Sequence, residues 1–441
     1  MVEFFNLLTQ KMKEIPSSKI QRTSRFVKTG LQIGGNYIKH YAQKLVNPEL
    51  EKEALDKANA EDIYNTLSEL KGSALKVAQM LSMDQGILPD AYSKKFAEAQ
   101  YKAPALSAPL VVKTFTNHFG KSPLAIFDTF DLKAVHAASI GQVHRATKGD
   151  KTFAVKVQYP GVADSVISDL SFVKPVAKQL FGWKEAELAV YFEEVQERLV
   201  EETCYDLELE RGSEIALACK ALPDLHFPTY YSEYSSSRIL TMDWMDGMHI
   251  DEFLKTNPTQ AIRNKAGQAL WDFYNYQLHV LNTMHADAPP GNFLFRADGS
   301  VVVLDFGCVK RFPKDFYATY SKLMKPEIMD NPDSFKAVCL EMGALRGDET
   351  PEREAFFLQI FHESVGMLLR PFYQGKYDFS DKAFFDELYA YGDSLAQKRN
   401  QLSDKPRGSQ HGIYLNRTYF GIYTMMHTLA AEVDTLRHIS L

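Results

Sequence analysis

Apolar residues recur every three or four positions along most of residues 1–104. The spacing is clearest over residues 25–45 and 61–83, and it is the spacing of an amphipathic helix. Pro89 then interrupts the pattern, and Pro109 precedes a further predicted helix. We therefore expect residues 1–104 to form a helical N-terminal extension, and we find no internal repeat in it.

The spacing becomes strand-like near residue 133. Val135–Ala146 predicts a strand, a turn and a second strand, and Phe153–Val157 is a short β-rich run bounded by turn residues. A long helical segment follows over about residues 185–222, and Arg238–Asp243 predicts another strand. Residues 105–242 are therefore expected to form a strand-rich N-terminal lobe with inserted helices.

Helical spacing dominates residues 243–441, the predicted C-terminal lobe. A small β unit is expected at Asn292–Phe295 and Val301–Leu304, across an Asp-Gly turn, and everything after Pro313 is predicted to be helical. The apolar stretch 418–433 is expected to be a buried helix. This order of elements favours a two-lobed α+β fold.

Composition supports a globular protein. Of 441 residues, 45% are hydrophobic and 24% are charged, so the chain can bury a core. The net charge of −6 gives no reason to expect a nucleic-acid partner. The four cysteines are far apart without a C-x-x-C pair, which argues for a reducing compartment and against structural zinc or disulfides.

No uninterrupted apolar run is long enough for a transmembrane helix, and the N-terminus lacks the order of a secretory signal. A cytoplasmic location, or the mitochondrial matrix in a eukaryote, is therefore expected. Residues 1–45 carry eight Lys/Arg against Glu3 and Glu14, next to Phe4 and Phe5. This segment is either an amphipathic helix on a membrane surface or a helix packed on the rest of the chain.

The sharpest chemical pattern is His285-Ala-Asp287, with Asn292 five residues beyond the aspartate and Asp305-Phe-Gly after the predicted hairpin. Phosphoryl transfer needs an acid that positions the attacking hydroxyl and oxygen ligands that hold Mg²⁺. Asp287 is the candidate base, and Asn292 and Asp305 are the candidate Mg²⁺ ligands. These residues could instead only build turns, but their joint spacing favours a phosphoryl-transfer site.

Upstream, Lys156 ends an Ala-Val-Lys run on a predicted strand, as does the kinase lysine that binds the α- and β-phosphates. By itself such a lysine could be a solvated edge residue. A Gly-rich phosphate loop is missing before it, and the segment 136–144 (HAASIGQVH) stands in its place. Because alanine restricts how closely a backbone approaches phosphate, we expect a non-standard nucleotide pose.

Together these motifs resemble the UbiB/AarF family of atypical kinase-like proteins. The segments 137–146 (AASIGQVHRA) and 154–162 (AVKVQYPGV) carry the resemblance most clearly. Residues 70–82 are similar to the family's K-x-G-Q signature, and residues 240–247 (LTMDWMDG) look like its hinge. HADAPPGN is similar to the family's H-A-D-P-H-P-G-N. The resemblance covers about residues 65–312.

The resemblance implies a protein-kinase-like two-lobed fold with a helical N-terminal extension and a helical C-terminal lobe. It implies ATP and Mg²⁺ as cofactors and a role in isoprenoid quinone or lipid metabolism. The partners would be a nucleotide, a quinone precursor or lipid, a membrane surface and proteins of quinone biosynthesis. Carried over by motif, the site comprises the phosphate loop Ala137, Ala138 and Ser139; Lys156 with its ion-pair partner Glu208; the hinge residues Met242 (the gatekeeper), Asp243 and Met245; and Lys76 and Gln79 of an inhibitory segment.

Three departures from the family pattern affect the regulatory region and the catalytic loop. Ala78 replaces the usual glycine, and the family's E-x-D reads Glu202-Thr-Cys204, so that its aspartate is missing. Cys204 is expected four residues before Glu208 on one helix face, close to the nucleotide. The third departure is Ala-Pro in place of Pro-His directly after Asp287.

The sequence therefore favours an atypical kinase or ATPase that supports quinone biosynthesis. A non-catalytic nucleotide-binding regulator or scaffold is the alternative, because the E-x-D and K-x-G-Q segments are altered. A small-molecule phosphotransferase is a third reading, since such enzymes share the catalytic spacing and lack a Gly-rich loop. The segment with Lys76 and Gln79 argues against it, because those enzymes have no reason to carry such a segment.

Overall fold

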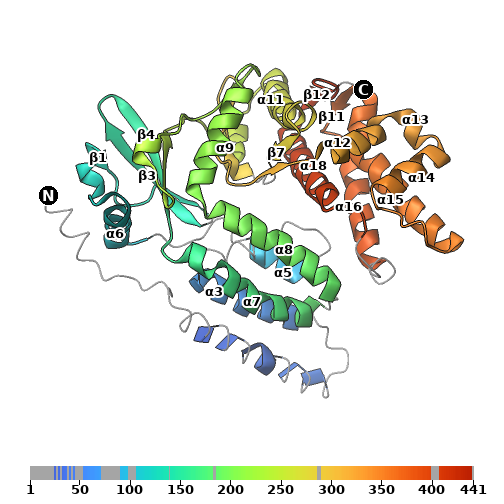
Figure 1. Ribbon diagram of the computed structural model, residues 1–441, viewed down its shortest axis with the longest axis horizontal. Helices are drawn as coiled ribbons and strands as arrows, with labels where there is room; N and C mark the ends of the chain where they lie inside the picture. The colour runs from blue at the N-terminus through green and yellow to red at the C-terminus, as the bar shows by residue number, and fades with distance from the viewer. Residues whose placement is uncertain are drawn as a thin grey trace. The chain divides into compact units, whose positions relative to one another are not determined.

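The computed structural model describes residues 53–70, 90–97, 106–138, 140–181, 185–285, 290–398 and 407–439, together with short helical stretches between residues 24 and 44. The described chain forms two compact units (Figure 1). The first holds the described residues up to Leu209, Thr229–Trp244 and residues 392–398; the second holds Glu210–Pro228, Met245–Tyr391 and residues from 407 onward.

The first unit is built around an antiparallel sheet of five strands. In spatial order β1, β3, β4 and β6 are neighbours, and β2 also pairs with β3. The strands are β1 (Thr129–Phe130), β2 (His136–Ala138), β3 (Gly141–Lys148), β4 (Lys151–Gln158) and β6 (Ile239–Asp243). The strands that the sequence predicts over Val135–Ala146, Phe153–Val157 and Arg238–Asp243 are thus confirmed.

The first unit also contains helices: α3 (Glu53–Leu70), α5 (Asp90–Ala97), α6 (Ala108–Phe119), α7 (Val162–Phe181), α8 (Glu185–Glu202) and the first turn of α9 (Tyr205–Ala218). Pro109 lies in the first turn of α6, where its missing N–H costs no hydrogen bond, and Gly120 ends the helix at φ +67°. Phe115 of α6 packs edge-on against Phe130 of β1 at 5.3 Å between ring centroids. The buried face of the sheet and α6 therefore share one apolar core.

The second unit is mainly helical, with α10 (Ile250–Lys255), α11 (Gln260–His279), α12 (Lys314–Tyr320), α13 (Pro326–Met329), α14 (Pro332–Glu341), α15 (Pro351–Gln374), α16 (Lys382–Gln397) and α18 (Gln410–Leu429). Its short strands pair as β5 (Leu225–His226) with β9 (Val301–Val303) and β8 (Phe293–Phe295), as β7 (Thr283–His285) with β10 (Val309–Arg311), and as β11 (Lys376–Asp378) with β12 (Glu432–Asp434).

Helix α11 is the core of the second unit. It begins after Thr259, whose hydroxyl accepts a hydrogen bond from the Ile262 N–H, and most of its side chains from Ala266 onward are buried. Trp271 is fully buried and stacks on Tyr423 of α18 at 6.1 Å between ring centroids. The α+β fold class is confirmed, whereas the domain bounds at residues 104 and 242 stay predictions.

Two expectations about local structure are wrong. The chain after Pro313 is not entirely helical, because β11 pairs with β12 through Tyr377 and Val433, and α18 ends at Leu429. Ala430 follows at φ +48°, which is incompatible with continuing the helix. The predicted helix over residues 185–222 is likewise broken, so that Cys204 lies between α8 and α9 and not within a helix shared with Glu208.

Candidate functional site

Lys156 and Glu208 form a buried ion pair in the first unit. The Lys156 Nζ atom lies 2.9 Å from each carboxylate oxygen of Glu208, and the side chains are 9% and 1% exposed. The Nζ atom also lies 5.1 Å from the centre of the Tyr205 ring. A buried ammonium group needs such partners because burial without them strongly disfavours its charge. The fold thus holds a charged lysine on β4, in the contact that the sequence predicts.

The sheet register places the predicted hinge on the same sheet face as this lysine. Lys156 pairs with Leu240 of β6, and Ala154 pairs with Met242. Because side chains alternate along a strand, Lys156, Ala154 and Met242 share one face. Met242 is therefore the next residue of β6 along the face that carries the ion pair.

Trp244 lies two positions beyond Met242, and the sequence prediction did not include it. Its ring lies 6.2 Å from the His136 ring and 5.2 Å from the Arg145 guanidinium carbon. The period of two from Leu240 through Met242 could have placed it on the face of the ion pair. It closes this end of the sheet face with an aromatic group.

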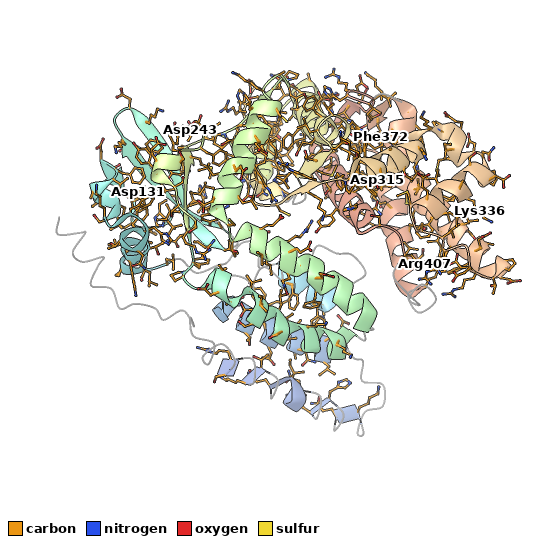
Figure 2. All side chains as sticks on the ribbon, in the orientation of Figure 1. Asp131, Asp243, Asp315, Lys336, Phe372 and Arg407 are labelled. Atoms are coloured by element: carbon orange, nitrogen blue, oxygen red, sulfur yellow. The ribbon has the colours of Figure 1, made fainter. Side chains whose placement is uncertain are left out.

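Asp243 uses its carboxylate within the fold. It accepts hydrogen bonds from the Tyr231 hydroxyl at 2.7 Å and from the Thr229 backbone N–H at 3.0 Å (Asp243 is labelled in Figure 2). Burial acts to raise the pKa of Asp243, but these hydrogen bonds outweigh it and lower the pKa below its ordinary value. A nucleotide contact at Asp243 would therefore come from the backbone.

Two of the three residues of the predicted phosphate loop, Ala137 and Ala138, lie in β2. Ala138 pairs with Gly141 of β3. A Cβ atom at Gly141 would lie 2.5 Å from the Val157 carbonyl oxygen and 2.8 Å from the Tyr205 hydroxyl. Only glycine fits there, so the end of the loop is held directly against β4.

In the second unit, His285 connects the two predicted catalytic motifs. It is fully buried, and its Nε2 atom lies 2.5 Å from the backbone carbonyl oxygen of Asp305. Since a carbonyl only accepts hydrogen bonds, Nε2 carries the proton. The His285 backbone N–H donates to the Gln277 side chain of α11 at 3.1 Å. The end of β7 is thereby fixed to both the Asp-Phe-Gly segment and α11.

Asn292 and Asp305 lie at the same end of the β8–β9 hairpin. Phe293 pairs with Val303, and the Leu304 N–H donates to the Asn292 carbonyl at 3.0 Å, so that Asp305 follows directly. The Asp305 Oδ1 atom accepts from the Gly307 N–H at 2.8 Å, which orients the carboxylate. Two residues with hard oxygen donors therefore lie at one end of this hairpin.

This donor set fits Mg²⁺. Among the residues that the structure describes, no group of three or more His, Cys, Asp or Glu side chains gathers as a metal cluster. Mg²⁺ does not require one, because it usually keeps water and phosphate oxygens and takes one or two carboxylates from the protein. The oxygen donors of Asn292 and Asp305 meet that requirement.

Comparison with known proteins now decides the family. The model of the ABC1 atypical kinase-like domain matches residues 98–338, more than half of the chain. The chain belongs to this family. The resemblance to UbiB/AarF atypical kinases is thereby confirmed.

The relatives of this ABC1 chain carry kinase names. The probable serine/threonine-protein kinase abkA of Dictyostelium discoideum is 28% identical over 370 residues, which are 79% of this chain and 65% of that protein. The mitochondrial atypical kinase COQ8 of Saccharomyces cerevisiae is 25% identical over 435 residues, which are 96% of this chain and 85% of that protein. The chain thus spans about two thirds of the Dictyostelium relative.

A solved structure shares the fold. The protein in the Rv3197–erythromycin complex from Mycobacterium tuberculosis has a TM-score of 0.58 and 26% identity to the ABC1 chain. The match covers 89% of this chain and 96% of that one. No described helix is both long and apolar enough to cross a membrane.

Several predicted site residues of the ABC1 chain fall outside the described residues, namely Lys76, Gln79, Ser139 and Asp287. Glu202 ends α8 and is half-buried. Cys204 follows in the break, and its carbonyl accepts the first hydrogen bonds of α9 from Leu207 and Glu208. Met245 is half-buried and begins the second unit's part of the hinge. The roles of these residues stay predictions.

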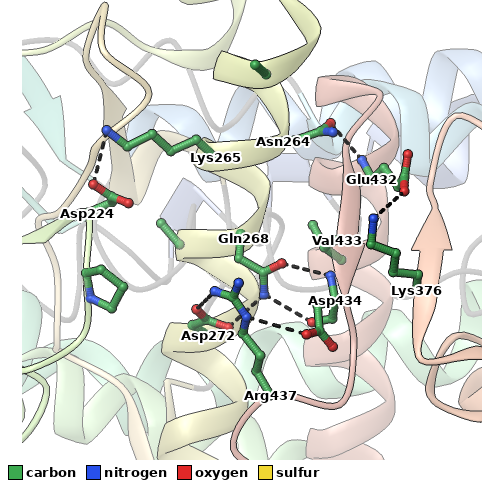
Figure 3. Close-up of a pocket in the computed structure, with 13 residues that line it drawn as sticks. Asp224, Asn264, Lys265, Gln268, Asp272, Lys376, Glu432, Val433, Asp434 and Arg437 are labelled. Carbon is green, nitrogen blue, oxygen red and sulfur yellow. Dashed lines mark hydrogen bonds and ion pairs between the residues drawn. The ribbon is translucent and has the colours of Figure 1, made fainter.

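A cavity of about 420 Å³ in the second unit contains none of the predicted residues (Figure 3). It lies between α11 and the C-terminal segment, and its charges pair with one another. Lys265 contacts Asp224 at 3.1 Å, and Lys376 contacts Glu432 at 3.2 Å. Because these pairs satisfy its walls internally, the cavity is no alternative to the kinase motifs as the reactive site.

Proposed function

We propose that this ABC1-family protein binds ATP with Mg²⁺ and acts as an atypical kinase or ATPase that supports isoprenoid quinone biosynthesis. The observation that carries the proposal is the buried Lys156–Glu208 pair on the sheet face that also bears Met242. A fold gains little from burying an ion pair for stability alone. The pair would instead serve to keep the lysine charged and oriented so that it can bind phosphate.

The residues of the first unit would bind the nucleotide. Lys156 would contact the α- and β-phosphates while Glu208 fixes its direction, and the backbone of Ala137, Ala138 and Ser139 would approach the phosphates. Met242 and the Asp243 backbone would border the base, together with Met245 of the second unit. The pKa of Asp243 fits this division, since its carboxylate is already occupied.

The residues of the second unit would carry the transfer. Asn292 and Asp305 would hold Mg²⁺, which supplies positive charge against the phosphates. Asp287 would accept the proton of the attacking hydroxyl or water. The oxygen of that hydroxyl or water would at the same time bond to the γ-phosphorus. The bond from that phosphorus to the bridging β–γ oxygen breaks, and ADP leaves with the bonding electrons. His285 supports the step only by fixing the backbone at Asp305.

The family supports a proposal about the partners, whereas the phosphate acceptor itself stays open. A quinone precursor or lipid at a membrane surface is the proposed partner, with proteins of quinone biosynthesis nearby, in the cytoplasm or the mitochondrial matrix. Lys76 and Gln79, with Glu202 and Cys204, would regulate access to the site. The alternative is a non-catalytic regulator, which the loss of the family's aspartate at Cys204 favours. A small-molecule phosphotransferase is the third option.

Turnover separates the atypical kinase or ATPase from the non-catalytic regulator. Phosphate release from ATP is measured with Mg²⁺ for the wild type, Lys156→Met and Cys204→Asp, with and without anionic liposomes or a phenol that resembles a quinone precursor. We expect turnover in the wild type, loss in Lys156→Met and stimulation by liposomes or phenol. Nucleotide binding without turnover in the wild type, with turnover gained in Cys204→Asp, would instead support the regulator.

A further inference from the structure

Two polar side chains of β3 point into the core of the first unit. Gln142 and His144 are both 0% exposed, on the strand face that also carries Ala146. Their β4 neighbours in the register are Val157 and Val155, which are also fully buried. Buried polar groups in an apolar core need hydrogen-bond partners, because an unmade bond there costs the full desolvation of the group.

The two side chains form a continuous chain of hydrogen bonds. The Leu106 backbone N–H lies 2.6 Å from the Gln142 Oε1 atom, and the Gln142 Nε2 atom lies 2.8 Å from His144 Nε2. His144 Nδ1 lies 2.6 Å from the carbonyl oxygen of Asp131, a residue that Figure 2 labels. We call this chain, from Leu106 to Asp131, the relay.

Donor and acceptor rules permit one arrangement of the relay. The Asp131 carbonyl only accepts, so His144 Nδ1 carries the ring proton and Nε2 accepts from the Gln142 amide. The Gln142 oxygen is then free to accept the Leu106 N–H, as observed. A second ring proton would make Nε2 a donor, which would then face the amide N–H donor of Gln142. If the Gln142 amide were flipped to accept from Nε2, its N–H group would instead face the Leu106 N–H, which is also a donor. The relay therefore requires a neutral His144.

The surroundings of the ring agree with that requirement. The His144 ring stacks on Phe130 at 5.0 Å between centroids. Burial lowers the pKa of His144 to about 4, although the bond to the Asp131 carbonyl acts in the opposite direction. The ring thus stays neutral at physiological pH.

The relay joins two functionally distinct parts of the chain. Gln142 pairs in register with Ala137 of the phosphate loop on one side and with Val157, next to Lys156, on the other. Leu106 is the first described residue after α5 and lies just before α6. The point at which the chain leaves its N-terminal extension is thus bonded to β3, the strand that pairs with Ala137 and Ala138 of β2.

We propose that Gln142 and His144 are positioning residues that fix the β2–β3 hairpin, and with it the phosphate loop, to Leu106 and Asp131. The role of the loop in binding phosphate rests on the proposed function, whereas the relay itself does not. Displacement of Leu106 moves Gln142 and hence the loop, so the N-terminal extension has a direct mechanical connection to the nucleotide site.

The tautomer of His144 tests the relay in the wild-type protein without any nucleotide. Nitrogen-15 NMR of histidine-labelled protein is recorded from pH 5.5 to 8, with His144→Phe used to assign the signal. We expect a neutral ring protonated at Nδ1 throughout this range. A ring protonated at Nε2, or one that becomes charged within this range, overturns the relay.

Variants test positioning. Gln142→Met and His144→Phe keep the approximate size of the side chains but replace their polar groups with apolar ones, which breaks the relay. Thr114→Val is the control, because it removes a partly buried hydrogen bond of the same unit, to Leu110. We expect Mg–ATP affinity to fall about fivefold or more in each relay variant, equivalent to about one hydrogen bond, and about twofold or less in the control. The double variant should be no weaker than the singles, since both break one relay.

Gln142→Glu is the conservative rescue. Its carboxylate still accepts from Leu106 and makes His144 a double donor, so NMR should show an imidazolium ring and Mg–ATP affinity within about twofold of wild type. Folded relay variants that bind Mg–ATP like the wild type overturn the positioning role.

Hydrogen exchange separates this proposal from the proposed function. Exchange at the amides of β2 and β3 should be about tenfold faster in Gln142→Met than in Thr114→Val, whether or not ATP binds. Unchanged exchange there overturns the proposal. A wild type that binds no ATP but shows the expected tautomer and exchange contradicts only the proposed function.

Discussion

At the scale of single residues, the fold keeps one buried pair of side chains charged and one half-buried histidine neutral. Lys156 and Glu208 stay charged because their opposite charges lie 2.9 Å apart and stabilise each other. His279, in α11, stays neutral: burial, with a smaller contribution from His438, lowers its pKa to about 4. Both arrangements have consequences for stability that can be measured.

Breaking the ion pair should destabilise the first unit. Lys156→Met or Glu208→Gln leaves the remaining group without its partner, and we expect a loss of about 3 kcal/mol or more in the free energy of unfolding. The double variant Lys156→Met/Glu208→Leu should recover most of that loss while nucleotide binding stays absent. Denaturant unfolding and titration with ATP measure the two effects. Single variants as stable as the wild type would show that the pair is not buried in solution.

The neutral state of His279 predicts a pH dependence. Because its folded pKa is about 4 and its ordinary value is 6.5, its contribution to stability is present above pH 6.5 and is lost as the pH falls through about 4. This loss amounts to about 3 kcal/mol. Unfolding by denaturant between pH 7 and 4 should show a smaller decline in His279→Phe than in wild type or in the control His427→Phe. Equal declines would contradict a neutral His279 ring.

The sequence indicates Lys156, Asn292 and Asp305 because their motifs have fixed spacing, and the structure shows local geometry that suits the proposed roles. The sequence could not indicate the relay, because Gln142 and His144 look like ordinary polar residues of an alternating strand. Their inward direction depends on pairing with β4 and on Leu106, which lies 36 positions away from Gln142. Long-range hydrogen bonds of this kind leave no periodic signal.

At the scale of elements, side chains on one face of α11 form hydrogen bonds with the backbone of the C-terminal segment. Gln260, Asn264 and Gln268, at intervals of four residues, bond to backbone groups of Ala430, Glu432 and Asp434 (Figure 3 shows the last two contacts). Gly267 lies on the same side, where a Cβ atom would be 2.5 Å from the Ala431 Cβ atom. The backbone of the segment that leads into β12 therefore packs closely against the backbone of α11.

This packing makes a prediction about glycine. Gly267→Ala should destabilise the protein by about 1 to 3 kcal/mol, because overpacking against Ala431 outweighs the gain in helix propensity. Gly366→Ala in α15 is the control: its nearest neighbour is the Met329 Cε atom at 3.8 Å, and it should be stabilising by up to about 1 kcal/mol. Ala431→Gly should suppress the effect of Gly267→Ala in unfolding measurements. Additive effects would contradict the contact.

The elements that the sequence misses have a common cause. β11 and β12 are three residues each and pair across more than 50 positions, so a helical pattern on both sides hides them. The break between α8 and α9 contains no proline or glycine, and apolar spacing continues through it. The strands of the first sheet are predicted well because they alternate and are bounded by turn residues.

At the scale of the whole molecule, the order of motifs along the chain predicts the fold class. The division into two compact units depends on contacts between distant residues, which the sequence does not reveal. Lys156 and Glu208 lie in the first unit, and Asn292 and Asp305 lie in the second. The proposed function predicts that each of these two sets of residues contributes to Mg–ATP binding. Loss of either set should abolish the stabilisation that Mg–ATP gives to the folded protein.

Calorimetric titration of the full chain with ATP, in Mg²⁺ and in EDTA, tests this central claim most directly. Asp305→Asn is compared with Asp298→Asn, an exposed aspartate in the turn of the same hairpin that bonds to Ser300. We expect Mg²⁺-dependent binding in the wild type and in Asp298→Asn, and loss of the Mg²⁺ dependence in Asp305→Asn. Absence of ATP binding in the wild type, or equal Mg²⁺ dependence in both variants, would contradict the account.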